Sequence, residues 1–207
     1  ARRVLEIEAN AVHSLADSQR MRQALRALDI SVVIDVAMTE TARQADYVLP
    51  ASSQFEKAEA TFFNVEFPRN GFHLRQPLFA PRQGTLTEAE IHARLLEALG
   101  ETDSSQYSLL RRAATLGRTA FGLAFAWKAA RDKKIARYAP VVLYRTLGET
   151  LPSGFEPAAS LWGISQLFVR NQRAAAARAG FGGNVLSAGK KLFDAIIKSA
   201  SGVIYSV

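Results

Sequence analysis

The stretch Ile30-Ser-Val-Val-Ile-Asp-Val36 decides the fold class of this chain. Its short run of β-branched apolar residues is typical of a strand buried in a parallel sheet. An apparent strand at Val4–Glu8 precedes it, and another at Tyr47–Leu49 follows it and ends at Pro50. We therefore expect three strands within the first fifty residues.

Helical segments connect these strands. A helix is predicted over 17–28, where apolar residues recur at helical spacing and Ser14 or Asp17 can cap the first amides. One or two helical turns are predicted over Thr39–Ala45, with Glu40 in the first turn, where the helix dipole favours a carboxylate. Together these elements make a βαβαβ unit with right-handed crossovers. The chain is therefore predicted to be an α/β protein with a Rossmann-like parallel sheet and helices.

The next segment reads as a loop region followed by a helix. Residues 51–83 show no long periodicity, and a short strand is expected around Phe72–Leu74. Thr87 and Glu90 then predict a capping box at the start of a helix that ends at Gly100.

After a polar linker at 101–106, the composition changes to alanine, arginine and lysine with helical spacing. We expect residues 1–100 to form the Rossmann-like region and residues 101–202 to form a helix-rich basic insertion. Residues 203–207 are predicted to be a strand that returns to the sheet. Within the insertion, helices are predicted at about 107–131, 156–179 and 185–200.

The charge of the chain is unevenly distributed. Residues 1–100 carry 11 Lys or Arg against 13 Asp or Glu, a net charge of −2, whereas residues 101–207 carry 15 against 6, a net charge of +9. A one-sided excess indicates a basic helical surface that faces an anionic partner, while nucleic acid is not the expected partner.

The residue content excludes several kinds of site. The chain has no cysteine, so it cannot itself hold an iron–sulfur cluster, a thiolate zinc site or a disulfide. Its longest strongly apolar run, Thr119–Ala130, has 12 residues against the roughly 20 that a membrane-spanning helix needs. His13, His73 and His92 show no metal-ligand spacing. The chain starts without Met and inside an apparent strand, so we expect it to be an internal piece of a longer polypeptide.

Polar residues follow each predicted strand. Asn10 follows the first strand, Asp35 ends the second, and Pro50–Gln54 follow the third. In an open α/β sheet, ligands bind beyond the carboxyl ends of the strands. A helix start with Thr39 and Thr41 suits a phosphate, and an aspartate suits a guanine edge or a ribose hydroxyl. Ordinary caps and turns are the alternative interpretation.

This interpretation makes a geometric prediction. Asn10, Asp35 and Thr39 should lie on one edge of a parallel sheet. The backbone amides of residues 39–41 should be free at a helix start.

Four motifs occur in order along the first third of the chain: Thr39-Glu-Thr-Ala42, Ala45-Asp-Tyr-Val-Leu-Pro50, Glu56-Lys57 and Ala60-Thr-Phe-Phe-Asn64. They resemble the third domain of the molybdopterin oxidoreductases of the dimethyl-sulfoxide reductase class, which includes formate dehydrogenases and nitrate reductases. The resemblance covers residues 3 to about 100.

The resemblance implies roles at the matching positions only. Asn10 matches the first-loop residue that lies against a molybdopterin guanine dinucleotide. Glu56, Thr61 and Asn64 match a later motif that is structural more than cofactor-binding, and a solvated pair is the alternative for Glu56-Lys57. The residues that match the second loop, where the nucleotide end is held, are Asp35, Met38, Thr39, Glu40 and Thr41.

The chain departs from the family pattern at its glycines. Glu8-Ala9 stand where the family has a glycine before the Asn, and Ala60 stands where it has a glycine before Thr61. Glycine lets a backbone approach a pyrophosphate closely, and alanine does so less freely. The resemblance therefore implies a divergent branch and leaves the substrate open.

By resemblance, the whole enzyme would move two electrons or an oxygen atom at molybdenum or tungsten held by two pterin dithiolenes, and a formate dehydrogenase-like reaction is expected. The metal ligand, the catalytic residues and an iron–sulfur cluster would belong to the remaining domains of the same polypeptide. An electron-transfer subunit is a further expected partner, and a cytoplasmic location is favoured over a periplasmic one.

A second hypothesis is a non-catalytic Rossmann-like binding module. Its basic helical arm would dock on a subunit, a membrane surface or nucleic acid. The segment 107–134 combines seven basic residues with Phe121, Phe125 and Trp127. Two interpretations stay open for it: a helix packed through its aromatic face, or an interfacial helix that binds a partner.

Overall fold

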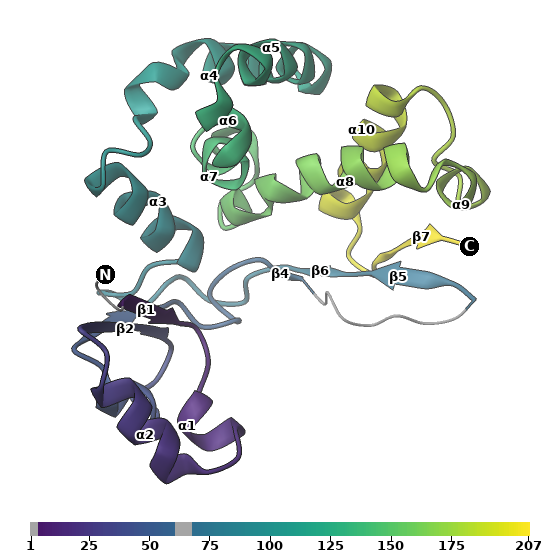
Figure 1. The fold of residues 1–207 in the computed structure, drawn as a ribbon. Coiled ribbons are helices and arrows are strands. Elements are labelled where there is room, and N and C mark those ends of the chain that lie inside the picture. Colours follow the sequence, from purple (N-terminus) through teal and green to yellow (C-terminus); the bar gives the residue numbers. More distant parts are fainter. Residues whose placement is uncertain (1–3, 61–67) are drawn as a thin grey trace.

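The computed structural model describes residues 4–60 and 68–207 (Figure 1). The chain forms two regions, a small parallel sheet with its helices and a larger body of helices above it (Figure 1). A two-stranded antiparallel sheet runs beneath the helical body. The predicted mixture of helices with a parallel sheet is therefore confirmed, as is the predominance of helices after residue 100.

The parallel sheet has the order β1-β2-β3, with β1 at Val4–Ile7, β2 at Ile30–Asp35 and β3 at Tyr47–Pro50. Val33 in the central strand stands opposite Ile7 on one side and Val48 on the other. Because all three strands are parallel, their carboxyl ends lie on one edge, where the loops that carry Asn10, Asp35 and Ala51 begin.

Helices cover both faces of this sheet. Helices α1 (Ala11–Ser14) and α2 (Ser18–Arg26) lie below it in Figure 1, and α3 (Glu88–Ala98) lies above it. Asp17 caps α2 by accepting a hydrogen bond from the backbone N–H of Arg20, as its position in the sequence predicts.

The capping box predicted for α3 is only half formed. Thr87 Oγ1 accepts a hydrogen bond from the backbone N–H of Glu90 at 3.3 Å. The Glu90 carboxylate instead binds Arg94, Tyr144 and Arg145. The reciprocal bond is lost because two of these partners, Arg94 and Arg145, are charged donors that bind the carboxylate more strongly than a backbone amide does.

The loop region after β3 contains more strand than expected. Strand β4 (Glu59–Ala60) pairs antiparallel with β6 (Leu74–Arg75). Strand β5 (Asn70–Phe72) pairs antiparallel with β7 (Val203–Ser206).

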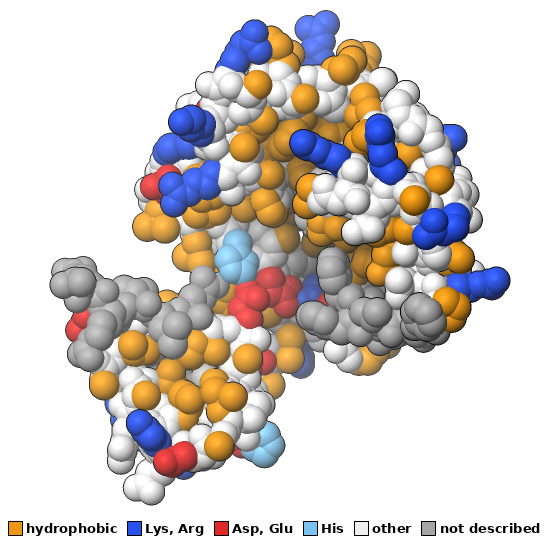
Figure 2. Space-filling view, turned by 45° about the vertical axis from the view of Figure 1, so that its right-hand side comes forward, with side chains coloured by type: hydrophobic (Ala, Val, Ile, Leu, Met, Phe, Trp, Pro, Cys, Tyr) orange, Lys and Arg blue, Asp and Glu red, His pale blue; other side chains and the backbone are white. Residues whose placement is uncertain are grey.

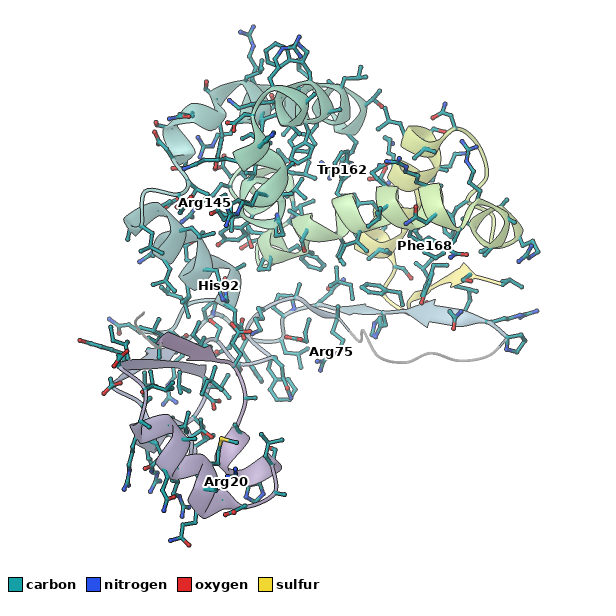
Figure 3. The ribbon with its side chains drawn as sticks, viewed as in Figure 1. Arg20, Arg75, His92, Arg145, Trp162 and Phe168 are labelled. Carbon is teal, nitrogen blue, oxygen red and sulfur yellow. The ribbon has the colours of Figure 1, made fainter. Side chains whose placement is uncertain are left out.

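The C-terminal strand forms as predicted, but its predicted return to the parallel sheet is wrong. It pairs with β5 in a separate two-stranded sheet. The physical reason is its apolar content, since Val203 and Tyr205 pack against the core of the helical region. Phe168 stacks edge-on to Tyr205 with ring centroids 5.1 Å apart and holds the strand beneath the helices (Figure 3).

The predicted helix at 107–131 is divided into a 3₁₀ turn and two α-helices. Gly117 adopts a φ of +115°, a conformation that residues with a Cβ rarely adopt, and it separates α4 from α5. These elements are η2 (Ser104–Tyr107), α4 (Ser108–Thr115) and α5 (Arg118–Arg131).

The remaining helices follow the predicted order with additions. The predicted helix at 156–179 is divided at Gln172, and the helix predicted at 185–200 ends at Lys198. The stretch 132–155, for which no helix is predicted, contains short helices around Pro140. In chain order these elements are α6 (Lys133–Arg137), α7 (Ala139–Tyr144), η3 (Gly148–Thr150), η4 (Glu156–Ala159), α8 (Ser160–Asn171), α9 (Arg173–Arg178) and α10 (Val185–Lys198).

The helical region has its own aromatic core. Phe121 is fully buried, and its ring meets that of Trp162 edge-on with centroids 5.2 Å apart (Figure 3). Phe125 contacts the same indole at 5.9 Å. At Gly122 an added Cβ would lie 2.8 Å from Leu186, so this glycine allows α5 to pack closely on α10. The interpretation of a helix packed through Phe121 and Phe125 is confirmed for those two rings.

A polar cluster joins the two regions where α3 meets α7. Arg145 donates to Glu90 at 2.6 Å and to Glu97 at 2.9 Å, and Tyr144 donates to Glu90 at 2.9 Å (Figure 3). Burial, reinforced by the bond to Glu90, raises the pKa of Tyr144 to about 12. Burial also disfavours the ionised Glu90, but the bonds from Arg94, Tyr144 and Arg145 outweigh it and hold its pKa below the ordinary value.

Within residues 4–60 and 68–207, the structure contains no helix with the length and apolar character needed to span a membrane.

Candidate functional site

Asp35 ends the central strand of the parallel sheet. Its Oδ1 accepts hydrogen bonds from the backbone N–H of Val36 at 2.7 Å and of Ala37 at 3.4 Å, and its Oδ2 accepts one from Thr39 Oγ1 at 3.0 Å. The carboxylate therefore holds the loop in a turn as soon as the strand ends. Its side chain is half-buried, and the outer lone pairs of Oδ2 can accept further donors.

Asn10 connects the loop after β1 to the loop after β2. Its Oδ1 accepts hydrogen bonds from Thr41 Oγ1 at 2.9 Å and from the backbone N–H of Thr41 at 3.3 Å. The Thr41 hydroxyl in turn accepts from the backbone N–H of Val12 at 2.9 Å, and Thr41 is fully buried. Two neighbouring loops at the strand ends are thus fixed to one another by a threonine that does not reach the surface.

Glu40 lies at the surface of the same cluster. Asn10 Nδ2 donates to Glu40 Oε2 at 2.6 Å. This bond is the main reason why the pKa of Glu40 lies below its ordinary value, and His13 and Arg43 lower it further. Glu40 is therefore a fixed negative charge at neutral pH on the exposed side of the loop.

The predicted geometry is confirmed in one respect and wrong in another. The structure brings Asn10, Asp35 and Thr39 to one edge of the parallel sheet through the contacts described above. The predicted free amides are not found at two of the three positions, since the N–H of Thr39 donates to the Ala37 carbonyl at 2.9 Å and that of Thr41 donates to Asn10.

The predicted helical turns at 39–45 shrink to the 3₁₀ turn η1 (Ala42–Gln44). The reason is that Asp35 and Asn10 bind the hydroxyls and an amide that would otherwise begin an α-helix. Val36 and Met38, which lie between these anchors, expose 60% and 57% of their surface. The loop therefore presents apolar side chains and carboxylates instead of a row of amides.

The pair Glu56-Lys57 does not form a solvated ion pair. Glu56 accepts a hydrogen bond from the backbone N–H of Ser53 at 2.8 Å and closes the turn after β3. Lys57 is buried and binds Glu88 of α3, with Glu59 at 3.9 Å. Both residues therefore stabilise the fold, as expected for a motif that is structural more than cofactor-binding. Thr61 and Asn64, the other residues of the motif, lie outside the described residues.

Sequence reasoning missed a contact between Glu8 and His92. Glu8 follows β1, and its Oε1 lies 3.4 Å from His92 Nε2 on α3 (Figure 3). His92 Nδ1 is hydrogen-bonded to the Glu88 carbonyl at 2.7 Å. No spacing in the sequence could reveal this pair, because it depends on how α3 packs over the sheet.

The side chains at this edge can accept hydrogen bonds and make apolar contacts. Among the described residues, no group of three or more His, Asp or Glu is arranged to hold a metal. The edge offers two carboxylates with spare acceptor capacity, Asp35 and Glu40, beside the exposed side chains of Val36 and Met38. Carboxylate oxygens accept the paired donors of a guanine edge, and apolar side chains cover the face of a base.

Part of this chain is similar to a known protein family. Residues 4–98 match the family model of the molybdopterin oxidoreductases. The matched residues include the whole parallel sheet, both loops that carry the cluster, and α3.

Three relatives illustrate the similarity. The F420-dependent formate dehydrogenase subunit alpha of Methanocaldococcus jannaschii is 37% identical over 99 residues, which are 48% of this chain and 14% of that protein. The probable oxidoreductase YoaE of Bacillus subtilis is 35% identical over 88 residues, 42% of this chain and 12% of that protein. The trimethylamine-N-oxide reductase of Vibrio vulnificus is 32% identical over 99 residues, 48% of this chain and 12% of that protein.

The matched part of this chain thus spans about one-seventh or less of the length of these relatives. The family match covers residues 4–98, the part of the chain that runs from β1 to the end of α3. Through residues 4–98, this chain is similar to the molybdopterin oxidoreductases.

Proposed function

We propose that this chain is part of a molybdenum or tungsten oxidoreductase of the formate dehydrogenase-like type. In this proposal its Rossmann-like sheet holds the nucleotide end of a molybdopterin guanine dinucleotide. The observation that carries the proposal is the joining of two loops at the carboxyl edge of the sheet, which leaves Asp35 and Glu40 beside exposed Val36 and Met38.

The acceptors and apolar side chains at this edge fit the base end of such a cofactor. Guanine presents neighbouring N–H donors on one edge, and the spare lone pairs of the Asp35 carboxylate can accept them. Met38 is exposed and flexible, so its thioether side chain can lie against a purine ring. Asp35, Met38 and Glu40 would therefore be the residues that touch the cofactor.

The same set does not fit a pyrophosphate. The amides of Thr39 and Thr41 are already hydrogen-bonded, and two carboxylates stand nearby. Hydrogen bonds within the two loops already use the side chains of Asn10, Thr39 and Thr41. We assign these three residues the task of positioning the loops, and we assign the phosphates of the cofactor to other parts of the enzyme.

When bound, the cofactor would supply a metal centre that exchanges two electrons or an oxygen atom with substrate. In this proposal the role of this chain is to bind and orient one end of the cofactor. The metal ligand and any iron–sulfur cluster belong to the remaining domains in this proposal, and an electron-transfer subunit is the further partner. A cytoplasmic location is part of the same proposal.

The test is nucleotide binding by the purified chain. We expect weak binding of GDP, used as the probe for the nucleotide end, and weaker binding of ADP, because adenine lacks the paired donors that Asp35 accepts. Asp35→Asn should lower the GDP affinity about 10-fold in calorimetric titrations, in line with roughly 1–3 kcal/mol for a bidentate base contact.

Asp17→Asn is the matched control, because asparagine caps a helix as well as aspartate does and the Asp17 side chain accepts from the backbone N–H of Arg20 in α2, not from the loop after β2. It should leave GDP binding unchanged. Equal binding of GDP and ADP would contradict the proposed roles, and so would a GDP affinity that Asp35→Asn leaves unchanged. The isolated chain should not oxidise formate or retain molybdenum, since it has no thiolate to bind the metal.

A further inference from the structure

One exposed face of the helical region is apolar without contributing to the core. Leu116, which follows the last residue of α4, and Leu123 and Trp127 of α5 expose 75%, 63% and 50% of their surface. The opposite side of α5 carries Phe121 and Phe125, which pack against Trp162. The fold therefore does not need Leu123 or Trp127, and their exposure calls for a separate explanation.

Basic side chains without a carboxylate partner surround these apolar residues. Arg112 and Lys133 are exposed and make no ion pair within the described residues. The Arg131 guanidinium lies 4.2 Å from the centre of the Trp127 ring and donates to the Trp127 carbonyl. We call these six residues the α4–α5 face: Arg112, Leu116, Leu123, Trp127, Arg131 and Lys133.

Some other basic side chains nearby are paired with carboxylates, whereas Lys128 of α5 donates to the Gln106 carbonyl. Arg111 pairs with Glu149 at 2.9 Å and Arg118 with Asp194 at 3.6 Å. The only acidic residue between 108 and 134 is Asp132, whose carboxylate caps α6 through the backbone N–H of Lys134. The α4–α5 face thus presents apolar surface and three cationic side chains, with the single carboxylate of Asp132 between Arg131 and Lys133 in the sequence.

We propose that the α4–α5 face docks on an anionic phospholipid surface. An interfacial helix places Trp and Leu at the level of the lipid headgroups, while Arg and Lys beside them bind the phosphates. The net charge of +9 in residues 101–207 adds long-range attraction to such a surface. A protein partner would have to place carboxylates around Trp127 at matching positions. A lipid surface presents phosphates wherever the basic side chains lie.

The position of the face suits this role. Helix α5 lies at the top of the molecule in Figure 1, and the parallel sheet lies in the lower part, above α1 and α2. On the side drawn in Figure 2, Lys and Arg side chains are spread over the helical body, whereas acidic side chains gather mainly at its junction with the smaller region. Docking through α5 therefore leaves the edge that carries Asp35 accessible.

The test measures binding of the full 207-residue chain to vesicles. We expect binding to phosphatidylcholine vesicles that contain phosphatidylglycerol, little binding to pure phosphatidylcholine, and a steep loss with added salt. The chain has two tryptophans, and Trp162 is buried. A blue shift of the fluorescence on binding would therefore report Trp127, and it should be lost in Trp127→Phe while sedimentation with the vesicles persists.

Charge variants decide whether the face itself is responsible. The triple variant Arg112→Gln, Arg131→Gln and Lys133→Gln should weaken partitioning about 100-fold, because each basic residue near an anionic surface contributes roughly fivefold. The matched control is Arg20→Gln, Arg22→Gln and Arg26→Gln on α2, which removes the same charge from the other end of the molecule (Figure 3).

Three results would overturn the proposal. One is equal binding to neutral and anionic vesicles, and another is equal weakening by the two triple variants. The third is self-association of the chain that Leu123→Ser abolishes, without vesicle binding, which would assign the face to contacts between copies of this chain.

Discussion

The two regions of this molecule reach their shapes by different means. In the parallel-sheet region, the cluster of Ile34, Ala51 and Ile91 is small, and the carboxyl edge is held by hydrogen bonds such as those of Asn10 and Thr41. The helical region packs a much larger cluster around Phe121 and Trp162. Directional polar contacts thus fix the carboxyl edge of the sheet region, and apolar burial fixes the helical region.

Truncating the aromatic core should have the largest effect. Phe121→Ala is expected to lower the free energy of unfolding by about 4 kcal/mol, since a fully buried ring is lost and a cavity remains beside Trp162. Phe79→Ala, at a ring that is 65% exposed, is the control and should change it by less than about 0.5 kcal/mol. Urea titration measures both. Similar losses in the two variants would contradict the assignment of the core.

Breaking the junction should test how far the regions depend on one another. Arg145→Leu is expected to cost about 3 kcal/mol, because Glu90 and Glu97 would keep largely buried charges without their main partner. Arg94→Leu removes an exposed partner of the same Glu90 and should cost well below about 1 kcal/mol. Equal costs in thermal unfolding would mean that burial at the junction is unimportant.

The same junction gives a pH dependence with a definite sign. The folded-state pKa of Glu90 is below its ordinary value of 4.5. Its contribution to stability is therefore present above pH 4.5 and is lost as the pH falls through the folded-state pKa. The stability difference between wild type and Arg145→Leu should be larger at pH 7 than at pH 3. A difference that grows toward low pH would contradict this account.

Thr41→Val tests whether hydrogen bonds fix the carboxyl edge of the parallel sheet. Valine keeps the shape but leaves the backbone N–H of Val12 without its acceptor, which should cost about 2 kcal/mol. Thr119→Val, at an exposed position on α5, should be nearly neutral. Hydrogen exchange at residues 10–12 should speed up in the first variant alone, and unchanged exchange there would refute the role of Thr41.

Helix caps should affect the two regions alike and least of all. Thr87→Ala on α3 and Asn184→Ala on α10 should each cost about 1 kcal/mol, because each removes one side-chain acceptor for an N-terminal amide. Thr87→Ser, which keeps the hydroxyl, is the control and should restore most of the loss. A cost at Thr87 several times that at Asn184 would show that the junction amplifies the cap.

Local patterns could predict the elements but not their partners. The run 30–35 and the cap at Asp17 are predictable because strand and cap signals lie within a few residues. The positions of Asn10 and Asp35 at one edge follow from parallel topology alone. The burial of Lys57 against Glu88 and the pairing of β7 with β5 depend on packing between distant segments, which no periodicity encodes.

The pairing of β5 with β7 also bears on the order in which the molecule folds. His73 and Ala200 are hydrogen-bonded at 3.1 Å although they are 127 positions apart in the chain. Closing so long a loop from the unfolded state costs about 4 kcal/mol in chain entropy, too much for a sheet of three residue pairs to offset alone. We therefore expect the helices enclosed by this loop to assemble first and shorten its effective span. The two strands would then pair late, and the antiparallel sheet would be among the first parts to open when the chain unfolds.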